Sequence, residues 1–148
     1  MNIIISPMNS HPLVSILIPV YGVEKYIERC ARSLFEQTYA NLEFIFVDDR
    51  IPDHSIQLLE NVLTMYPHRL KQVKIIKHSK NEGIAVVRNT AISNATGDFI
   101  FFVDSDDYIE TDTISALVNE QNLTNADIVS GKMLINENGM DSRYVEPI

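Results

Sequence analysis

The sequence predicts an α/β domain with a mostly parallel sheet and helices on both faces. Short apolar runs alternate with segments whose apolar residues repeat at helical spacing, which is typical of consecutive strand and helix units. The run at 99–103 is apolar at every position, as in a strand covered on both faces in the middle of a parallel sheet. A length of 148 residues with 45% hydrophobic content suits one such unit.

The expected elements follow one another in a regular order. Strands are expected at 14–18, 44–47, 73–76, 99–103 and 128–131, with a helix in each interval. Asp53 and Thr111 are expected to cap the second and fourth helices, and Gly97 to end the third as its C′ residue. Beyond Ile135 the signal fades: 136–139 resembles a turn, and 140–148 is either one more short strand or a tail. Right-handed crossovers then give a doubly wound fold.

The acidic residues are concentrated in the last third of the chain. The net charge is −8, and residues 98–148 hold eleven acidic and two basic side chains. This imbalance argues against sequence-independent nucleic-acid binding, which needs clustered Lys and Arg, and calls for a cation instead. The single cysteine, Cys30, cannot form an internal disulfide, and no apolar run approaches a membrane span. We therefore expect a cytoplasmic protein.

Carboxylates follow two of the expected strands. Asp48 and Asp49 come directly after the second strand, and Asp104, Asp106 and Asp107 come after the fourth. The carboxyl ends of parallel strands share one edge of a sheet, which is where ligands of such folds bind. Carboxylates that lie close together repel one another, and a divalent cation relieves the repulsion. Oxygen ligands favour Mg²⁺ or Mn²⁺, so the sequence predicts such an ion on Asp104, Asp106 and Asp107.

The sequence lacks the usual glycine-rich phosphate loops. The loop after the first strand has one glycine, Gly22, where a dinucleotide fold has G-x-G-x-x-G, and no G-K-[ST] occurs anywhere. If a diphosphate binds here, its charge must be neutralised by the metal, helped by a cation such as Arg88.

Six short segments occur in a characteristic order. They are VSILIPVY at 14–21, QTY at 37–39, VDD at 47–49, NEG at 81–83, AVVRN at 85–89, and GDFI through DSDD at 97–107. Together they resemble the successive signatures of family 2 glycosyltransferases with the GT-A fold, a Rossmann-like architecture. The resemblance runs from about residue 13 to about residue 135.

The resemblance implies positions for the nucleotide. Pro19 and Tyr21 match the loop that lies against the base, where an aromatic ring can stack. Asp49 matches the carboxylate that accepts a hydrogen bond from the base, and uracil offers its N3–H for such a bond. Arg88 matches the arginine that approaches the diphosphate.

The resemblance also implies a metal-dependent reaction. Asp104 and Asp106 match the D-x-D that holds the metal and the ribose diphosphate, and Asp107 matches an acidic position that is itself a ligand in some members. Family members invert the anomeric centre in one displacement. The expected function is therefore transfer of a sugar from a nucleoside diphosphate sugar, with a UDP-sugar favoured, to a saccharide or lipid-linked acceptor in polysaccharide synthesis.

The expected domain organisation follows from the same resemblance. Residues 1–12 would be an N-terminal extension, 13–135 the nucleotide-sugar-binding GT-A domain, and 136–148 a tail or the start of the acceptor half. The chain would be truncated before that half, and the general base is expected beyond residue 148. The full-length protein would act in the cytoplasm, with peripheral association at the inner membrane face.

Two alternatives and two departures stand beside this interpretation. The alternatives are a non-catalytic nucleotide-sugar-binding module and a phosphohydrolase of the haloacid dehalogenase kind, which also has a D-x-D after an apolar strand. Arg50 and Ile51 follow Asp49 where the family usually has Gly and Ser, and Gly22 stands where Asn is frequent.

The four histidines share no metal-like spacing and are interpreted as surface or loop residues: His11, His54, His68 and His78.

Overall fold

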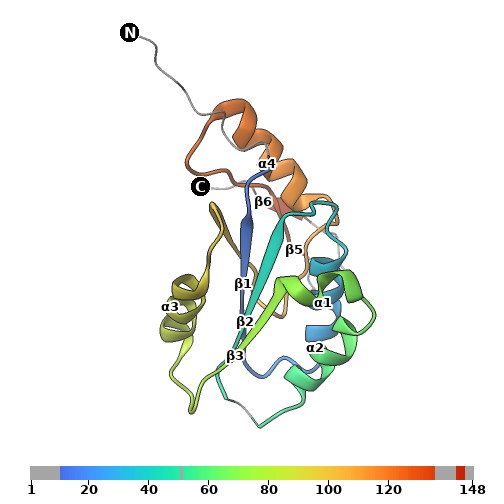
Figure 1. Cartoon of the computed structure of the whole chain (residues 1–148), viewed down its shortest axis with the longest axis vertical. Helices are drawn as coiled ribbons and strands as arrows, with labels where there is room; N and C mark the ends of the chain where they lie inside the picture. The colour runs from blue at the N-terminus through green and yellow to red at the C-terminus, as the bar shows by residue number, and fades with distance from the viewer. Residues whose placement is uncertain (1–10, 51, 136–142, 146–148) are drawn as a thin grey trace.

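A parallel sheet of four strands, in the order β3-β2-β1-β4, forms the centre of the fold (Figure 1). The computed structural model describes residues 11–50, 52–135 and 143–145. The strands of the sheet are β1 (Val14–Val20), β2 (Leu42–Asp48), β3 (Val73–Lys77) and β4 (Phe99–Phe102). A separate antiparallel pair joins β5 (Met133–Ile135) to β6 (Arg143–Val145).

Helices cover both faces of the sheet, as the sequence predicted. The helices are α1 (Ile27–Phe35), α2 (Ser55–Leu63), α3 (Ile84–Asn94) and α4 (Thr113–Thr124), with a 3₁₀ helix, η1 (Pro67–Gln72), after α2. In Figure 1, α1 and α2 lie on one side of the strands and α3 on the other. Within the described residues, no helix has the length and apolar composition needed to cross a bilayer.

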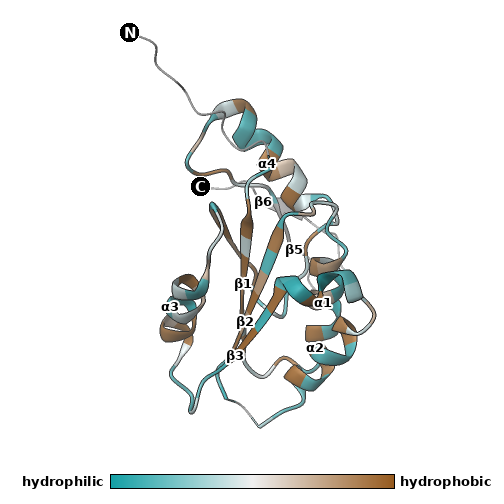
Figure 2. Ribbon diagram, viewed as in Figure 1, coloured by the Kyte–Doolittle hydropathy of each residue, from teal (hydrophilic) through white to brown (hydrophobic). Residues whose placement is uncertain are grey.

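Alternation along the strands builds one apolar layer on each face. On the side of α1 and α2, the Phe35 ring meets the Phe44 ring edge-on at 5.3 Å and packs against Phe46. On the other side, Leu17 of β1 packs with Val87 of α3. Figure 2 shows apolar residues along β1 and β2 between the helices. Burial of these two layers supplies the main stabilising term of the fold.

The position of β4 differs from the prediction. This strand pairs with β1 alone among the described strands, so it lies at an edge of the sheet and not in its middle. The side chains of Ile100 and Phe102 are 49% and 39% exposed. Helix α3 packs mainly against β1 and β2, and its Arg88 lies over the Phe102 ring at 5.8 Å.

Several predicted element boundaries were also wrong. Helix α4 begins after Asp112 without a side-chain cap, so Thr111 does not cap it. Asp53 does bind the start of α2, accepting the Ser55 N–H at 3.0 Å, although it lies one residue before the N-cap position. Residues 128–131 form no strand; the strand lies further along, at β5.

Two expectations fall partly or wholly outside the described residues. Strand β6 confirms one more short strand within 140–148. The predicted turn at 136–139 and residues 1–10 of the predicted N-terminal extension lie outside the described part of the chain, as does Ile51.

Gly97 holds two segments together and does not end α3. The C-cap of α3 is Ala95, in an extended conformation. A Cβ on Gly97 would lie 2.5 Å from Ser15 Oγ and 2.7 Å from the Leu13 carbonyl oxygen, so only glycine fits against β1. The Gly97 N–H donates to Ser15 Oγ at 2.8 Å and to Glu43 Oε1 at 3.1 Å. Burial raises the pKa of Glu43, but its hydrogen bonds from Ser15, Thr96 and Gly97 outweigh this and lower it.

We expect Gly97→Ala to lower the free energy of unfolding by about 1–3 kcal/mol, because the added methyl group meets backbone that cannot move aside. Gly131→Ala is the matched control, since its Cβ would meet nothing closer than Leu117 Cδ2 at 4.0 Å. Urea unfolding of both variants measures the difference. Equal stabilities for the two variants would contradict the close approach at Gly97.

Candidate functional site

The strand order reverses at β1, where β2 and β3 lie on one side and β4 on the other. Ligands of open α/β sheets bind outside the carboxyl ends at such a point. Pairing with β4 ends at Leu17, whereas pairing with β2 continues to Val20. The backbone groups of Val14 and Val20 form hydrogen bonds with residues at the two ends of β2. Alternate residues of a strand bond to opposite neighbours, so the backbone nitrogen of Pro19 faces the side of β4. Its missing N–H therefore falls beyond the pairing with β4, where it removes no hydrogen bond of that ladder.

A pocket of about 320 Å³ lies at this end of the sheet. Three residues predicted to bind the nucleotide line it together: Pro19 near the end of β1, Tyr21 directly after β1, and Asp49 directly after β2. The Tyr21 side chain is 52% exposed and available to a ligand. The rest of the lining comes from β1, the loop before α3 and the first turns of α3: Val20, Asn81, Gly83, Ile84 and Val87.

A larger groove of about 500 Å³ lies elsewhere, between β4 and α4. Its lining is mainly apolar and includes none of the residues predicted to bind the nucleotide or the metal. The smaller pocket is the better candidate, because it collects the polar groups at the strand ends.

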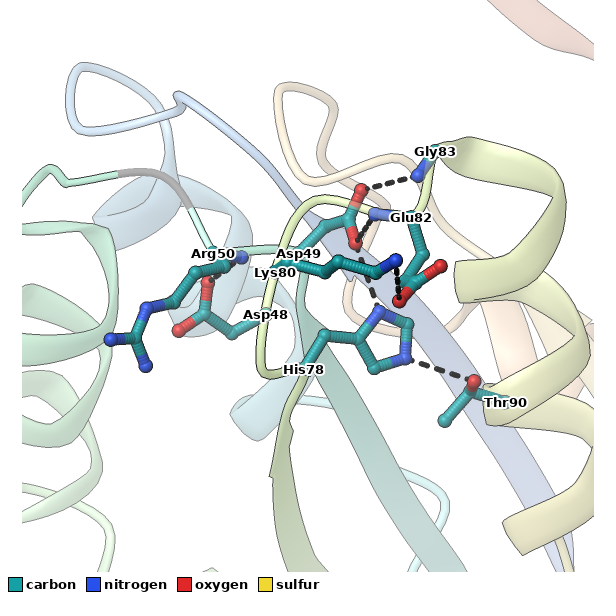
Figure 3. Close-up of polar contacts among 8 residues, drawn as sticks. All are labelled: Asp48, Asp49, Arg50, His78, Lys80, Glu82, Gly83 and Thr90. Atoms are coloured by element: carbon teal, nitrogen blue, oxygen red, sulfur yellow. Dashed lines mark hydrogen bonds and ion pairs between the residues drawn. The ribbon is translucent and has the colours of Figure 1, made fainter.

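The Asp49 carboxylate is buried and accepts three hydrogen bonds (Figure 3). Oδ1 accepts the Glu82 N–H at 2.9 Å and lies 2.9 Å from His78 Nδ1; Oδ2 accepts the Gly83 N–H at 2.8 Å. Burial raises the pKa of Asp49, but these hydrogen bonds together outweigh it and leave the pKa below its ordinary value. Asp49 is therefore a fixed carboxylate at the start of α3.

His78 is a loop residue, as predicted, but its side chain is mostly buried and belongs to the site. Its side chain is 11% exposed, and Nε2 lies 2.9 Å from Thr90 Oγ1 while Nδ1 faces Asp49. The residue comes directly after β3, so it shares the strand edge with Asp49. Its position at a strand end was the one sequence signal that pointed to the site.

The two departures from the family pattern have a backbone explanation. Arg50 has φ of 58°, in the left-handed region that glycine adopts most easily, at the position where the family usually has glycine. Its N–H donates to Asp48 Oδ1 at 3.0 Å, which identifies Asp48 as a turn-forming residue. Gly22 has φ of 66°, a conformation that both Gly and Asn tolerate.

The acidic loop, residues 104–107 after β4, lies near Arg88 of α3. Arg88 Nη2 forms an ion pair with Asp104 Oδ1 at 3.2 Å, and both side chains are about half exposed. The Asp107 N–H donates to the Asp104 carbonyl and closes a turn. Burial raises the pKa of Asp107, and the neighbouring Asp106 and Asp104 raise it further. The loop thus carries the repulsion between carboxylates that the sequence predicted.

Side chains of α1 and of the segment directly after it hold the backbone of the loop that follows β4. The sequence interpretation did not predict these contacts. Arg29 donates to the Asp106 carbonyl at 3.3 Å and lies over the Tyr108 ring at 4.5 Å. Further along, Ser33 accepts the Ile109 N–H, and Gln37 of the QTY segment donates to the Glu110 carbonyl at 2.6 Å. Arg29 and Ser33 are four positions apart on α1, so they share one helix face, and Gln37 follows just after the helix ends.

The donor chemistry of the acidic loop fits a hard divalent cation, although the ligand set is not assembled. Among the described residues, no group of three or more His, Cys, Asp or Glu side chains is arranged to hold a metal ion. Asp48 and Asp49 follow β2 at the same edge of the sheet, but backbone amides and His78 engage them, so they do not form one group with the carboxylates after β4. Asp104, Asp106 and Asp107 lie on one exposed turn, where Asp104 pairs with Arg88.

The sequence profile described as Glycosyl transferase family 2 matches residues 15–145. The chain belongs to this family. It is 41% identical over 118 residues to an uncharacterized glycosyltransferase, EpsJ, of Bacillus subtilis, which covers 80% of this chain and 33% of that protein. It is 38% identical over 109 residues to chondroitin synthase of Escherichia coli, covering 74% of this chain and 15% of that protein.

A solved structure shows the same fold. S. aureus TarS 1–349 in complex with UDP has a TM-score of 0.64 and 32% identity, over 74% of this chain and 33% of that one. The predicted GT-A fold is confirmed, and the phosphohydrolase alternative is wrong because the family is a different one. The family 2 chain described here spans about a third of the length of EpsJ and of TarS 1–349.

We expect Asp49→Asn to lower the free energy of unfolding by about 2 kcal/mol at neutral pH, because an amide nitrogen cannot accept the hydrogen bonds of the carboxylate. The folded pKa of Asp49 lies below its ordinary value. Its contribution is thus complete above about pH 4 and is lost as the pH falls through the lower folded pKa.

Urea unfolding of the wild type and the variant, from neutral pH down to about pH 3, measures this loss. Asp127→Asn, a change to an exposed carboxylate, is the control. The assigned hydrogen bonds would be contradicted if the difference in the free energy of unfolding between the wild type and Asp49→Asn stayed constant down to the lowest pH.

Proposed function

We propose that residues 13–135 form the donor-binding part of a glycosyltransferase that takes its sugar from a UDP-sugar in polysaccharide synthesis. The observation that carries the proposal is the pocket at the strand reversal, where Pro19, Tyr21 and Asp49 meet. The likeness to TarS, whose structure holds UDP, and to a chondroitin synthase supports the donor class and the product class.

The base of the nucleotide binds between Tyr21 and Asp49. The exposed Tyr21 ring offers a stacking surface next to the apolar ring of Pro19. The Asp49 carboxylate accepts the N3–H of uracil at the inner end of the pocket. A lowered pKa keeps this acceptor ionised at neutral pH.

The diphosphate binds toward Arg88 and the acidic loop. Arg88 already pairs with Asp104, so its guanidinium lies at the border between the base pocket on α3 and the loop after β4. Asp104, Asp106 and Asp107 would hold Mn²⁺ or Mg²⁺ there. When bound, such an ion acts as a Lewis acid that stabilises negative charge on the departing nucleoside diphosphate.

Transfer to a saccharide or lipid-linked acceptor, with inversion, would complete the reaction. The acceptor site and the general base would belong to a part that this chain does not include; the chain spans about a third of EpsJ. Residues 136–148 would lead toward that part, and the full-length protein would work at the inner face of the membrane.

We expect UDP to stabilise the chain only when Mn²⁺ is present. At 100 times its dissociation constant, the nucleotide should add about 2.7 kcal/mol to the free energy of unfolding. Asp106→Asn should remove this gain, whereas Glu60→Gln, the same charge change at an exposed position of α2, should keep it. Thermal unfolding with Mn²⁺ and with chelator provides the measurement. Stabilisation of Asp106→Asn equal to that of the wild type would rule out this ligand.

Arg88→Gln is expected to weaken UDP binding about tenfold, since a charged hydrogen bond to a phosphate contributes about 1.5–3 kcal/mol. Uridine, which has no phosphate, should bind the variant and the wild type alike. Lys71→Gln removes the same charge from η1, at the opposite end of the strands, and is the control. Calorimetric titration separates these cases; an equal loss of uridine and UDP affinity would place Arg88 outside the diphosphate site.

A further inference from the structure

A chain of three side chains crosses from β2 to α3 behind the pocket (Figure 3). Asp49 Oδ1, His78 Nδ1, His78 Nε2 and Thr90 Oγ1 follow one another at successive distances of 2.9 Å. A carboxylate can only accept hydrogen bonds, so His78 Nδ1 carries the proton and donates to Asp49. Thr90 holds the other edge of the imidazole ring, which fixes the direction of this donor.

The hydrogen bonds to Asp49 leave it little free acceptor capacity. A carboxylate offers about four acceptor positions, two on each oxygen. His78 and the Glu82 amide occupy both positions on Oδ1, and the Gly83 amide occupies one on Oδ2. One position remains, on Oδ2, and Asp49 is one of the residues that line the pocket.

Nucleotide bases differ in what they offer to such an acceptor. Guanine presents two adjacent donors, N1–H and the 2-amino group, which engage both oxygens of a carboxylate. Uracil and thymine present one donor, N3–H, between two carbonyl oxygens that repel a second carboxylate oxygen. A carboxylate with a single free position on one oxygen therefore suits uracil or thymine and not guanine.

We infer that His78 is a positioning residue that holds Asp49 Oδ1 away from the base and so restricts the pocket to bases with a single imide donor. This inference rests on the proposed function, because it requires the base to lie against Asp49. Glu82, Gly83 and Thr90 flank or belong to the helix that carries Arg88. The same network therefore aligns the base end and the phosphate end of the site.

Calorimetric titration of UDP and of GDP with Mn²⁺, on the wild type and two variants, tests the inference. His78→Phe keeps a ring but removes the donor to Asp49, whereas His78→Asn keeps an N–H in place of Nδ1–H. The wild type should bind UDP at least about tenfold tighter than GDP. The ratio of UDP affinity to GDP affinity should fall to about three or less in His78→Phe and return toward the wild-type value in His78→Asn.

The outcomes separate this inference from the proposed function. Equal affinities for UDP and GDP in the wild type, or a wild-type ratio in folded His78→Phe, would overturn the inference and leave the proposed function standing. Binding of neither nucleotide by the wild type would overturn both. If His78→Phe does not fold, Thr90→Val, which removes only the second partner of the imidazole, should still lower the ratio; an unchanged ratio would then overturn the inference.

Discussion

Strand β1 is paired on both sides, and all seven of its residues are buried. Because β2 and β4 are parallel to it, the loops that follow all three strands emerge at one edge of the sheet. Pairing with β4 stops at Leu17, two residues before Pro19, and Pro19 is one of the residues that line the pocket. The candidate site thus lies where the end of β1 meets the loop after β2 and the start of α3.

Burying Asp49 at this edge creates the second constraint. An ionised carboxylate in a buried position is tolerated only when its oxygens are hydrogen-bonded. The Glu82 and Gly83 amides and His78 meet that need, and in doing so they join the end of β2 to the start of α3. In the proposed site, stability and recognition would use the same atoms, because the hydrogen bonds that stabilise the buried charge leave one acceptor position for a ligand.

The carboxylates of the acidic loop are exposed, in contrast to the buried Asp49. Asp104 is about half exposed and pairs with Arg88, while the loop backbone is held to α1 by Arg29 and Cys30. Burial near Asp107, Asp106 and Asp104 raises the pKa of the Cys30 thiol to about 12, so this cysteine is an inert packing residue. The carboxylates are thus left with solvent access and mutual repulsion, which suits the cation site proposed for this loop.

Local sequence alone determined the order of strands and helices, the carboxylates after β2 and β4, and the family, because periodicity and short motifs involve near neighbours in the chain. It could not determine the partners of a side chain. The edge position of β4, the pairing of His78 with Asp49 and the fit of Gly97 against β1 join residues far apart in sequence. Only the tertiary structure decided these features, since strand order and contacts between elements follow from packing and not from local propensity.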